Sequence, residues 1–374
     1  MSDTDSTGRM DSDTLVRVEN LKKHFRVNSG LVTDITNTIR GEEPDMVHAV
    51  DGIDFELRQG ETLGIAGESG CGKTTTGMLL TKLYEATAGS IYYDGQDISD
   101  VEGEGLRKFR QNAQMIFQDP FESLNPRRTV YDTVVEPLRI HNIGNQRARV
   151  RRALEFAELR PADQFFDQYP HELSGGQRQR VAIARALVVD PEFIVADEPV
   201  SMLDVSLRAG VLSLLERMTQ EFGLSVVYIS HDLSLLRHMC DRIAIMYMGK
   251  IVEMGPTEAI VENPKHPYTK NLINAVPVPD PNTGRERVEL PGEVGDAIDI
   301  PTGCRFKERC SEYIGDVCDK VIPPIEQKTD FEDERGVACH LYESAEGFDP
   351  YAQMEGSGSA ANGADTEAAA SSDD

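Results

Sequence analysis

The sequence GESGCGKT at residues 67–74 follows a short apolar run, LGIA at residues 63–66, and precedes a stretch of helical character. It fits the pattern G-x-x-x-x-G-K-[ST], in which glycines let the backbone curl until successive N–H groups point at an anion. The N-terminus of the helix expected over residues 74–84 adds positive potential. The sequence therefore predicts a phosphate-binding loop, whose expected contact residues are Gly67, Ser69, Gly70, Cys71, Gly72, Lys73, Thr74 and Thr75.

Two residues of this loop and two acids elsewhere predict a hydrolytic site. Lys73 is expected to reach the β- and γ-phosphates of a nucleotide, and the Thr74 hydroxyl is expected to ligate Mg²⁺. The apolar run FIVA at residues 193–196 is followed by Asp197 and Glu198. Because neighbouring residues at a strand end point to different sides, Asp197 can face the metal while Glu198 faces an attacking water.

Short apolar runs alternate with helical stretches from residue 62 onward, as in βαβ units with a mainly parallel, buried sheet. The expected strands of this sheet cover residues 63–66, 114–117, 193–196, 225–229 and 243–248. Residues 130–159 indicate helices, so a helical subdomain is expected at about residues 119–176. Residues 15–18, 53–57 and 90–93 indicate antiparallel strands. The predicted fold class is α/β, with a mainly parallel sheet core, an antiparallel β subdomain, a helical subdomain and a small cysteine-containing extension.

Composition predicts where the folded part of the chain begins and ends. Residues 1–14 and 343–374 are rich in Asp, Ser, Gly and Ala and contain almost no large apolar side chains, so both ends are predicted to be disordered. The polar residues 28–46 are expected to form a loop between paired strands. Proline density rises after residue 261, which divides the chain into a main domain over residues 15–262 and a second unit over residues 263–342.

The net charge is −26, from 38 Lys and Arg against 64 Asp and Glu. Such a surface repels phosphate backbones, so nucleic acid is not an expected partner. No apolar run approaches the ~20 residues needed to cross a bilayer, and the N-terminus lacks the features of a signal peptide, so we expect a cytoplasmic protein. High salt would screen the self-repulsion of this surface, which suits a halophilic source, although a merely acidic protein would have the same composition.

The next motif resembles the signature of the ATP-binding-cassette (ABC) ATPases. Residues 173–177 have the sequence LSGGQ, in which Ser174 and the two glycines present donors at the start of a helix, and this makes a second anion site. The family works as a head-to-tail dimer, in which the signature of one subunit closes over the ATP on the phosphate loop of the other. The resemblance therefore implies that the ATP of a partner subunit is contacted by Ser174, Gly175, Gly176 and Gln177.

Other motifs of the family follow along the chain. Gln118 resembles the Q-loop glutamine, which in the family touches Mg²⁺ and links the site to the membrane subunits. Asp204, in the run SMLD at residues 201–204, resembles the D-loop aspartate of the usual SALD. His231 resembles the switch histidine that contacts the γ-phosphate, and Phe25 stands where the family places an aromatic ring on adenine. The resemblance thus implies ATP and Mg²⁺ as ligands, with Thr74, Gln118 and Asp197 around the metal and with Glu198, His231 and Gln118 in catalysis.

Within the ABC ATPases, the chain is similar to the ATP-binding subunits of oligopeptide and dipeptide permeases, and most of all to the F-type subunit. The similarity spans about residues 15–342 and rests on the segments 47–52, 67–72, 118–127 and 265–269. It implies an ATPase that drives peptide import from the cytoplasmic face of the membrane. The implied partners are a second, D-type ATPase subunit, two transmembrane permease subunits, which dock on residues 130–159, and an extracellular solute-binding protein.

Other functions remain open. Nickel or sugars are alternative cargoes, because no residue of this chain touches the cargo. Soluble ABC proteins that act on DNA or ribosomes share the nucleotide motifs, but they generally carry two cassettes or a coiled-coil insertion, which this sequence does not show. A non-hydrolysing regulatory cassette would not require Glu198, His231 and Ser174.

The second unit contains four cysteines, Cys304, Cys310, Cys318 and Cys339. Disulfides are disfavoured in a reducing cytoplasm, and the close C-x₂₋₄-C pairs typical of zinc sites do not occur in this set. Four thiolates on an irregular scaffold can also hold an iron–sulfur cluster. Because some members of the permease family bind a 4Fe-4S cluster in this region, the resemblance favours that cofactor, while zinc and unligated thiols remain open.

Overall fold

The computed structural model describes residues 13–27, 45–275, 298, 300–327, 331 and 333–342 of the 374-residue chain. The expected disorder of residues 1–14 and 343–374, and the expected loop over residues 28–46, fall almost entirely outside the described residues. These three expectations therefore stay predictions.

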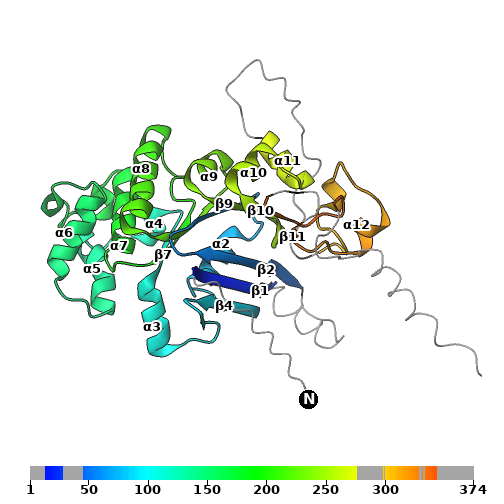
Figure 1. Ribbon diagram of the computed structural model, residues 1–374. Coiled ribbons are helices and arrows are strands. Elements are labelled where there is room, and N and C mark those ends of the chain that lie inside the picture. Colours follow the sequence, from blue (N-terminus) through cyan, green and yellow to red (C-terminus); the bar gives the residue numbers. More distant parts are fainter. Residues whose placement is uncertain are drawn as a thin grey trace, which may run out of the picture.

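An eight-stranded sheet runs through the molecule in the order β11-β12-β10-β9-β3-β8-β7-β6 (Figure 1). Five neighbouring strands are parallel: β9 (Arg242–Tyr247), β3 (Thr62–Ala66), β8 (Ser225–Ser230), β7 (Phe193–Asp197) and β6 (Ala113–Ile116). Strands β3, β7 and β8 are buried along their whole length, as apolar runs predict for parallel strands covered on both faces. The predicted mainly parallel sheet is confirmed.

The first strands of the chain form a four-stranded antiparallel sheet in the order β2-β1-β4-β5. These strands are β1 (Thr14–Arg26), β2 (Met46–Arg58), β4 (Ala88–Tyr93) and β5 (Gln96–Asp97). Ile53, Phe55 and Leu57 of β2 are buried, whereas residues 54, 56 and 58 are exposed. This is the alternation that the sequence predicts for a half-buried strand, and it confirms the antiparallel subdomain.

A helical group lies at one end of the molecule and the C-terminal residues lie at the other (Figure 1). The helical group comprises α4 (Pro120–Ser123), α5 (Val130–Ile140), α6 (Gln146–Phe156) and α7 (Gly175–Leu187). The other α-helices of the described residues are α2 (Lys73–Leu80), α3 (Gly103–Asn112), α8 (Val205–Phe222), α9 (Leu233–Met239), α10 (Thr257–Glu262), α11 (Pro267–Asn274) and α12 (Asp316–Lys320). Short 3₁₀ turns lie at Ala162–Gln164, Pro170–Glu172 and Lys307–Arg309. None of the described helices combines the length and the apolar character that crossing a membrane requires.

One helix differs from its predicted extent. The helix expected over residues 74–84 begins at Lys73 and ends at Leu80. Lys82 adopts a left-handed conformation with a φ of 54°, which an α-helix cannot contain. The expectation of a longer helix was therefore wrong at its C-terminal end.

The C-terminal unit, residues 300–342, shares its sheet and its core with the main domain. Strand β10 (Lys250–Pro256) pairs antiparallel with β12 (Gly336–Val337), which in turn pairs with β11 (Glu326–Gln327). Tyr268 of α11 and Phe306 are buried in the same hydrophobic cluster as strands of the main sheet. The second unit expected from residue 263 onward is thus packed directly on the sheet that carries the phosphate loop.

Candidate nucleotide-binding and hydrolysis site

The phosphate loop connects β3 to α2, and two of its glycines are fixed by close contacts. Gly67 and Gly72 have φ values of 157° and 105°. A Cβ on Gly67 would lie 2.2 Å from the carbonyl oxygen of Met246, and a Cβ on Gly72 would lie 2.0 Å from that of Ala49. Because both obstacles are backbone atoms, only glycine fits at either position. The loop therefore lies in direct contact with β9 on one side and with β2 on the other.

Lys73 begins α2, and its ammonium group lies against the loop. Its Nζ donates hydrogen bonds to the carbonyl oxygens of Gly67 (2.8 Å) and Glu68 (2.9 Å), and the residue is 6% exposed. Cys71 is also buried, and burial raises the pKa of its thiol, so it packs as a small neutral residue. Two carbonyl oxygens of the loop thus fix the position of the Lys73 ammonium group.

The phosphate loop opens into a cavity of about 590 Å³, which is within the usual size of small-molecule sites. The cavity is lined by Val47, Ala49, Ser69, Gly70, Gly72, Lys73, Thr74, Thr75, Gln118, Glu198 and His231. Most of these residues were expected from the sequence. Val47 and Ala49 of β2 were not, because the segment 47–52 served only the family resemblance and these residues reach the cavity through the packing of β2 on the loop.

Asp197, the last residue of β7, fits the predicted metal position. It is 2% exposed, and burial raises the pKa of its carboxyl group, while a hydrogen bond with the Thr74 side chain opposes the increase. Its Oδ1 atom is buried without a hydrogen-bond partner among the described residues. A carboxylate oxygen left unsatisfied beside a threonine hydroxyl is the kind of oxygen ligand that Mg²⁺ takes.

Glu198, His231 and Gln118 form one hydrogen-bonded set. Glu198 has a φ of 43°, and its backbone N–H donates to the carbonyl oxygen of Ile229 (2.8 Å), which holds the residue at the end of the sheet. Its Oε1 lies 3.0 Å from Nδ1 of His231, and its Oε2 accepts a hydrogen bond from Nε2 of Gln118 at 3.2 Å. The structure thereby brings together the three residues expected to act in catalysis.

The residues that resemble the ABC signature lie outside this cavity. Ser174 caps α7: its Oγ accepts the N–H of Gln177 (3.3 Å), and the Oε1 of Gln177 accepts the N–H of Ser174 (2.8 Å). Gly175 and Gly176 follow in the first turn of α7. All four residues are described by the structure, and none of them lines the cavity of the phosphate loop. A single chain therefore does not bring its two anion sites to one cavity.

Gly67, Cys71 and Asp197 are also absent from the cavity lining, although they adjoin residues that form it. Asp204 and Phe25 do not line it either. Asp204 is the N-cap of α8, and Ser201, three residues earlier, donates from its Oγ to the carbonyl oxygen of Glu198 (3.0 Å). Phe25 is half-buried in β1, where it pairs in register with Val47 of the cavity lining. Its ring packs edge-on against Tyr84, with centroids 5.6 Å apart. Phe25 thus lies beside the cavity, on a segment that contributes a wall to it.

The four cysteines of the C-terminal unit lie near one another. Burial is the main reason that the pKa of Cys304 rises to about 11 and that of Cys339 to about 12, and the neighbouring cysteines add to both increases. Among the described residues, no three of the four sulfur atoms lie within 4.8 Å of one another. Zinc, at ~2.3 Å from each sulfur, would hold them only ~3.8 Å apart. No three of the sulfur atoms therefore have the spacing of a formed zinc site.

A second group of possible metal ligands in the described part of the chain is His24, His48 and Asp51, whose ligand atoms lie within 4.8 Å of one another. His24 Nε2 lies 2.9 Å from Asp51 Oδ1, and Arg305 pairs with the other carboxylate oxygen. Burial would raise the pKa of Asp51, but the hydrogen bond with His24 and the charge of Arg305 outweigh it and lower the pKa to about 2. Since an arginine already neutralises this carboxylate, the group is an ion-pair network rather than a metal site.

Comparison with known families and proteins identifies two matched regions. A family described as ABC transporter matches residues 50–201, and a family described as oligopeptide/dipeptide transporter, C-terminal region, matches residues 252–318. The oligopeptide transport ATP-binding protein AppF of Bacillus subtilis is 45% identical over 336 residues, which cover 88% of this chain and 98% of that protein. The dipeptide transport ATP-binding protein DppF of Escherichia coli is 43% identical over 313 residues, which cover 83% of this chain and 90% of that protein.

Solved structures of ABC cassettes share the fold. The dimeric ATP-binding cassette MJ0796, bound to ADP and phosphate after hydrolysis, is 28% identical, with a TM-score of 0.55 over 65% of this chain and 99% of that chain. The CbiO1 protein of Clostridium perfringens, part of an ABC transporter complex, is 27% identical, with a TM-score of 0.54 over 67% of this chain and 92% of that chain. The expected nucleotide-binding fold is therefore confirmed.

We predict that Glu198→Gln lowers ATP turnover by roughly 10²- to 10⁴-fold, the usual contribution of a positioned general base, because an amide cannot accept the proton of the attacking water. ATP binding, measured by titration, should stay close to that of the unmodified chain. The matched control is Glu192→Gln, the same chemical change just before the other end of β7, where Glu192 accepts a hydrogen bond from Tyr93 (2.6 Å). Near-normal turnover in Glu198→Gln would exclude Glu198 as the base.

Proposed function

The chain belongs to the ATP-binding subunits of oligopeptide and dipeptide ABC transporters, and from this premise we propose that it is the ATP-hydrolysing motor of a peptide importer. It binds ATP at the phosphate loop and hydrolyses it. The resulting closure and opening of a pair of ATPase subunits drives the uptake of peptides through the membrane subunits.

The observation that carries this proposal is a hydrolytic nucleotide cavity joined, in one chain, to a transporter-type C-terminal region. Lys73 and Glu198 line one cavity and supply the phosphate-binding cation and the base, and Asp197, hydrogen-bonded to the cavity residue Thr74, supplies the metal ligand. Residues 252–318 match the C-terminal region of oligopeptide/dipeptide transporters. On this basis we assign the nucleotide-binding domain to residues 15–262, with its helical subdomain at about residues 119–176, and the C-terminal domain to residues 263–342.

A second ATPase subunit completes the site. Residues 174–177 of the same chain do not line the cavity, and the similar cassette MJ0796 is dimeric. In the proposed cycle, Lys73 of one subunit and Ser174 of the other hold the same ATP. Thr74, Gln118 and Asp197 would hold Mg²⁺, which would supply positive charge against the phosphates. Hydrolysis then releases the contact between the subunits. We favour a D-type chain as the partner over a second copy, because the similarity is to the F-type subunit of a permease with two different ATPases.

The proposed contact with the two permease subunits lies between α3 and α5. A cavity of about 420 Å³ opens there, and its lining includes Leu106 of α3, Ile140 of α5 and Phe117, which directly precedes Gln118. Ile140 is 55% exposed although it is apolar. An apolar groove beside Gln118 suits a helix of a membrane protein that must respond to the nucleotide. With such a contact, we propose that the subunit lies at the cytoplasmic face of the membrane and the solute-binding protein on the opposite side.

We predict that Ile140→Arg abolishes co-purification with the permease subunits and lowers ATP-dependent peptide uptake by proteoliposomes by at least about 10-fold, because a buried unpaired charge opposes docking. ATP binding should be retained. Ile322→Arg, at a similarly exposed isoleucine (52%) of the C-terminal unit, is the matched control. Uptake of nickel or sugars in place of peptides would contradict the proposal that peptides are the cargo. Stable association with ribosomes or DNA in place of permeases would contradict the transport function.

The proposed additional cofactor is a 4Fe-4S cluster held by Cys304, Cys310, Cys318 and Cys339. Support comes from their proximity and from a sulfur spacing wider than a zinc site requires. Anaerobically purified protein should contain about four iron atoms and four sulfides per chain and absorb in the sulfur-to-iron charge-transfer region. Cys310→Ser should lose this iron, whereas Cys240→Ser, at a buried cysteine outside the group, should retain it. Colourless protein without iron, or stoichiometric zinc, would contradict the cluster.

We also propose that the net charge of −26 reflects a halophilic source. Molar salt screens repulsion between surface carboxylates, so it stabilises a chain that is this acidic. The free energy of unfolding should accordingly rise between low and molar KCl. Full stability at low salt would indicate an ordinary acidic protein.

A further inference from the structure

We propose that Arg309 is a positioning residue for the phosphate loop, which it holds through Glu68, so that the affinity of the site for ATP depends on the C-terminal unit. This inference rests on the proposed function as an ATPase. Glu68 occupies the first variable position of the motif G-x-x-x-x-G-K-[ST], so the motif itself gives this residue no role.

Arg309 and Glu68 form a two-pronged ion pair. Nη1 of Arg309 lies 2.8 Å from Oε2 of Glu68, and Nη2 lies 3.1 Å from Oε1. The side chain of Arg309 is 8% exposed and that of Glu68 is 24% exposed. Paired bonds from a guanidinium to a carboxylate fix orientation as well as distance. Removing one partner of such a shielded pair leaves an uncompensated charge, which is costly.

The backbone of Glu68 transmits this restraint to Lys73. The carbonyl oxygen of Glu68 accepts a hydrogen bond from Nζ of Lys73 at 2.9 Å. Its N–H donates to the hydroxyl of Tyr268 at 2.9 Å. The side chain and both peptide groups of Glu68 are thus all held, and one of these contacts is with the ammonium group that binds phosphate. A shift of Glu68 would therefore move an acceptor on which the position of Lys73 depends.

Two tyrosines support the pair, one at the end of β9 and one in α11. Tyr247 ends β9, and its ring centre lies 5.8 Å from the guanidinium carbon of Arg309. The ring of Tyr247 packs on that of Tyr268, with centroids 4.7 Å apart, and both rings are buried. Tyr268 lies in the segment KHPYT, residues 265–269, so this segment has a physical role in holding the phosphate loop.

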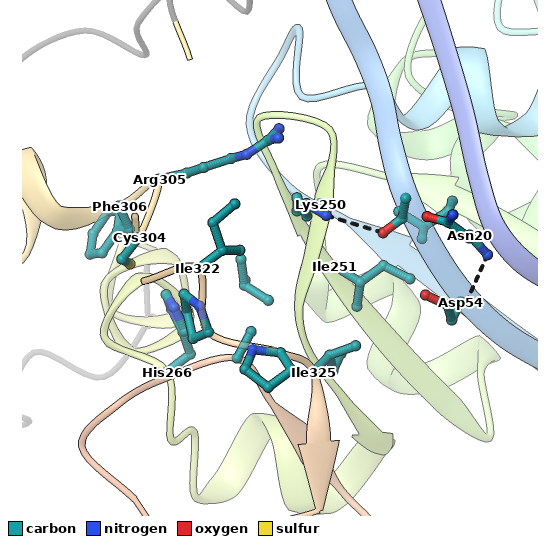
Figure 2. Close-up of a pocket in the computed structure, with 16 residues that line it drawn as sticks. Asn20, Asp54, Lys250, Ile251, His266, Cys304, Arg305, Phe306, Ile322 and Ile325 are labelled. Atoms are coloured by element: carbon teal, nitrogen blue, oxygen red, sulfur yellow. Dashed lines mark hydrogen bonds between the residues drawn. The ribbon is translucent and has the colours of Figure 1, made fainter. Parts of the chain in front are cut away.

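A second arginine makes a parallel contact between the C-terminal unit and the nucleotide domain. In Figure 2 the side chain of Arg305 extends above Cys304 and Phe306, on the opposite side of the pocket from Asn20 and Asp54. These residues line a cavity of about 420 Å³. Arg305 donates to Asp51 of β2 and to the carbonyl oxygen of Met248. Cys304 directly precedes Arg305 and Cys310 directly follows Arg309. A rearrangement of these cysteines would therefore displace both arginines, one of which holds the phosphate loop.

The test is a double-mutant cycle on the full-length chain, with binding of a fluorescent ATP analogue and steady-state hydrolysis as readouts. Arg309→Met should weaken nucleotide binding and raise KM for ATP by about 10-fold, with kcat within about 3-fold, because the catalytic set is untouched. Glu68→Gln should have a similar effect, and the double variant should bind no more weakly than either single variant. Arg309→Lys, which keeps the charge but loses the two-pronged geometry, should give an intermediate affinity.

Lys307→Met is the matched control, because Lys307 lies in the same 3₁₀ turn but, among the described residues, its side chain bonds within the C-terminal unit, to the carbonyl oxygen of Thr302 (2.9 Å) and to Asp319 (3.2 Å). It should bind nucleotide like the unmodified chain. Unchanged ATP affinity in Arg309→Met, additive losses in the double variant, or an equal loss in Lys307→Met would each overturn the proposal. Binding is measured without hydrolysis, so an inactive unmodified chain would contradict the proposed function and leave this test valid.

Discussion

The contact of the phosphate loop with two backbone carbonyl groups is the constraint on which the nucleotide site depends. Gly67 lies against Met246 at the end of β9, and Gly72 lies against Ala49 of β2, with no room for a Cβ at either point. The loop is therefore shaped by two strands from different sheets as much as by its own glycines. Lys73, held by two carbonyls of that loop, takes its position from the same contacts.

The catalytic set depends in turn on the order of the parallel strands. β6, β7 and β8 are neighbours in the sheet, and the residues that follow them are Gln118, Glu198 and His231. Carboxyl ends of parallel strands meet at one edge of a sheet, which is where α/β proteins place their ligands. Three side chains that are distant in the sequence thereby share hydrogen bonds around Glu198.

The C-terminal unit is connected to the nucleotide site by strand pairing and by ion pairs. It adds two strands to the main sheet, and it sends Arg305 to Asp51 and Arg309 to Glu68. Although the chain has a net charge of −26, these two arginines are buried, and each forms an ion pair with a partly buried carboxylate near the nucleotide site. The arrangement gives the four-cysteine region a structural connection to the phosphate loop.

Local sequence patterns were enough to predict the parts of the protein that depend on neighbouring residues. The phosphate loop, the acidic pair at the end of β7, the alternation in β2 and the strands of the parallel sheet all follow from local patterns, because turn geometry, strand burial and helix starts act over a few residues. The identity of most residues around the nucleotide cavity could be predicted for the same reason.

Only the tertiary structure decided which distant groups meet. It placed Val47 and Ala49 in the cavity wall, left Ser174 outside it, and joined Arg309 to Glu68 across 241 positions of the chain. It also ended α2 at Leu80, before the predicted C-terminus. Such contacts depend on how strands and loops pack in three dimensions, and a pattern of neighbouring residues carries no information about that packing.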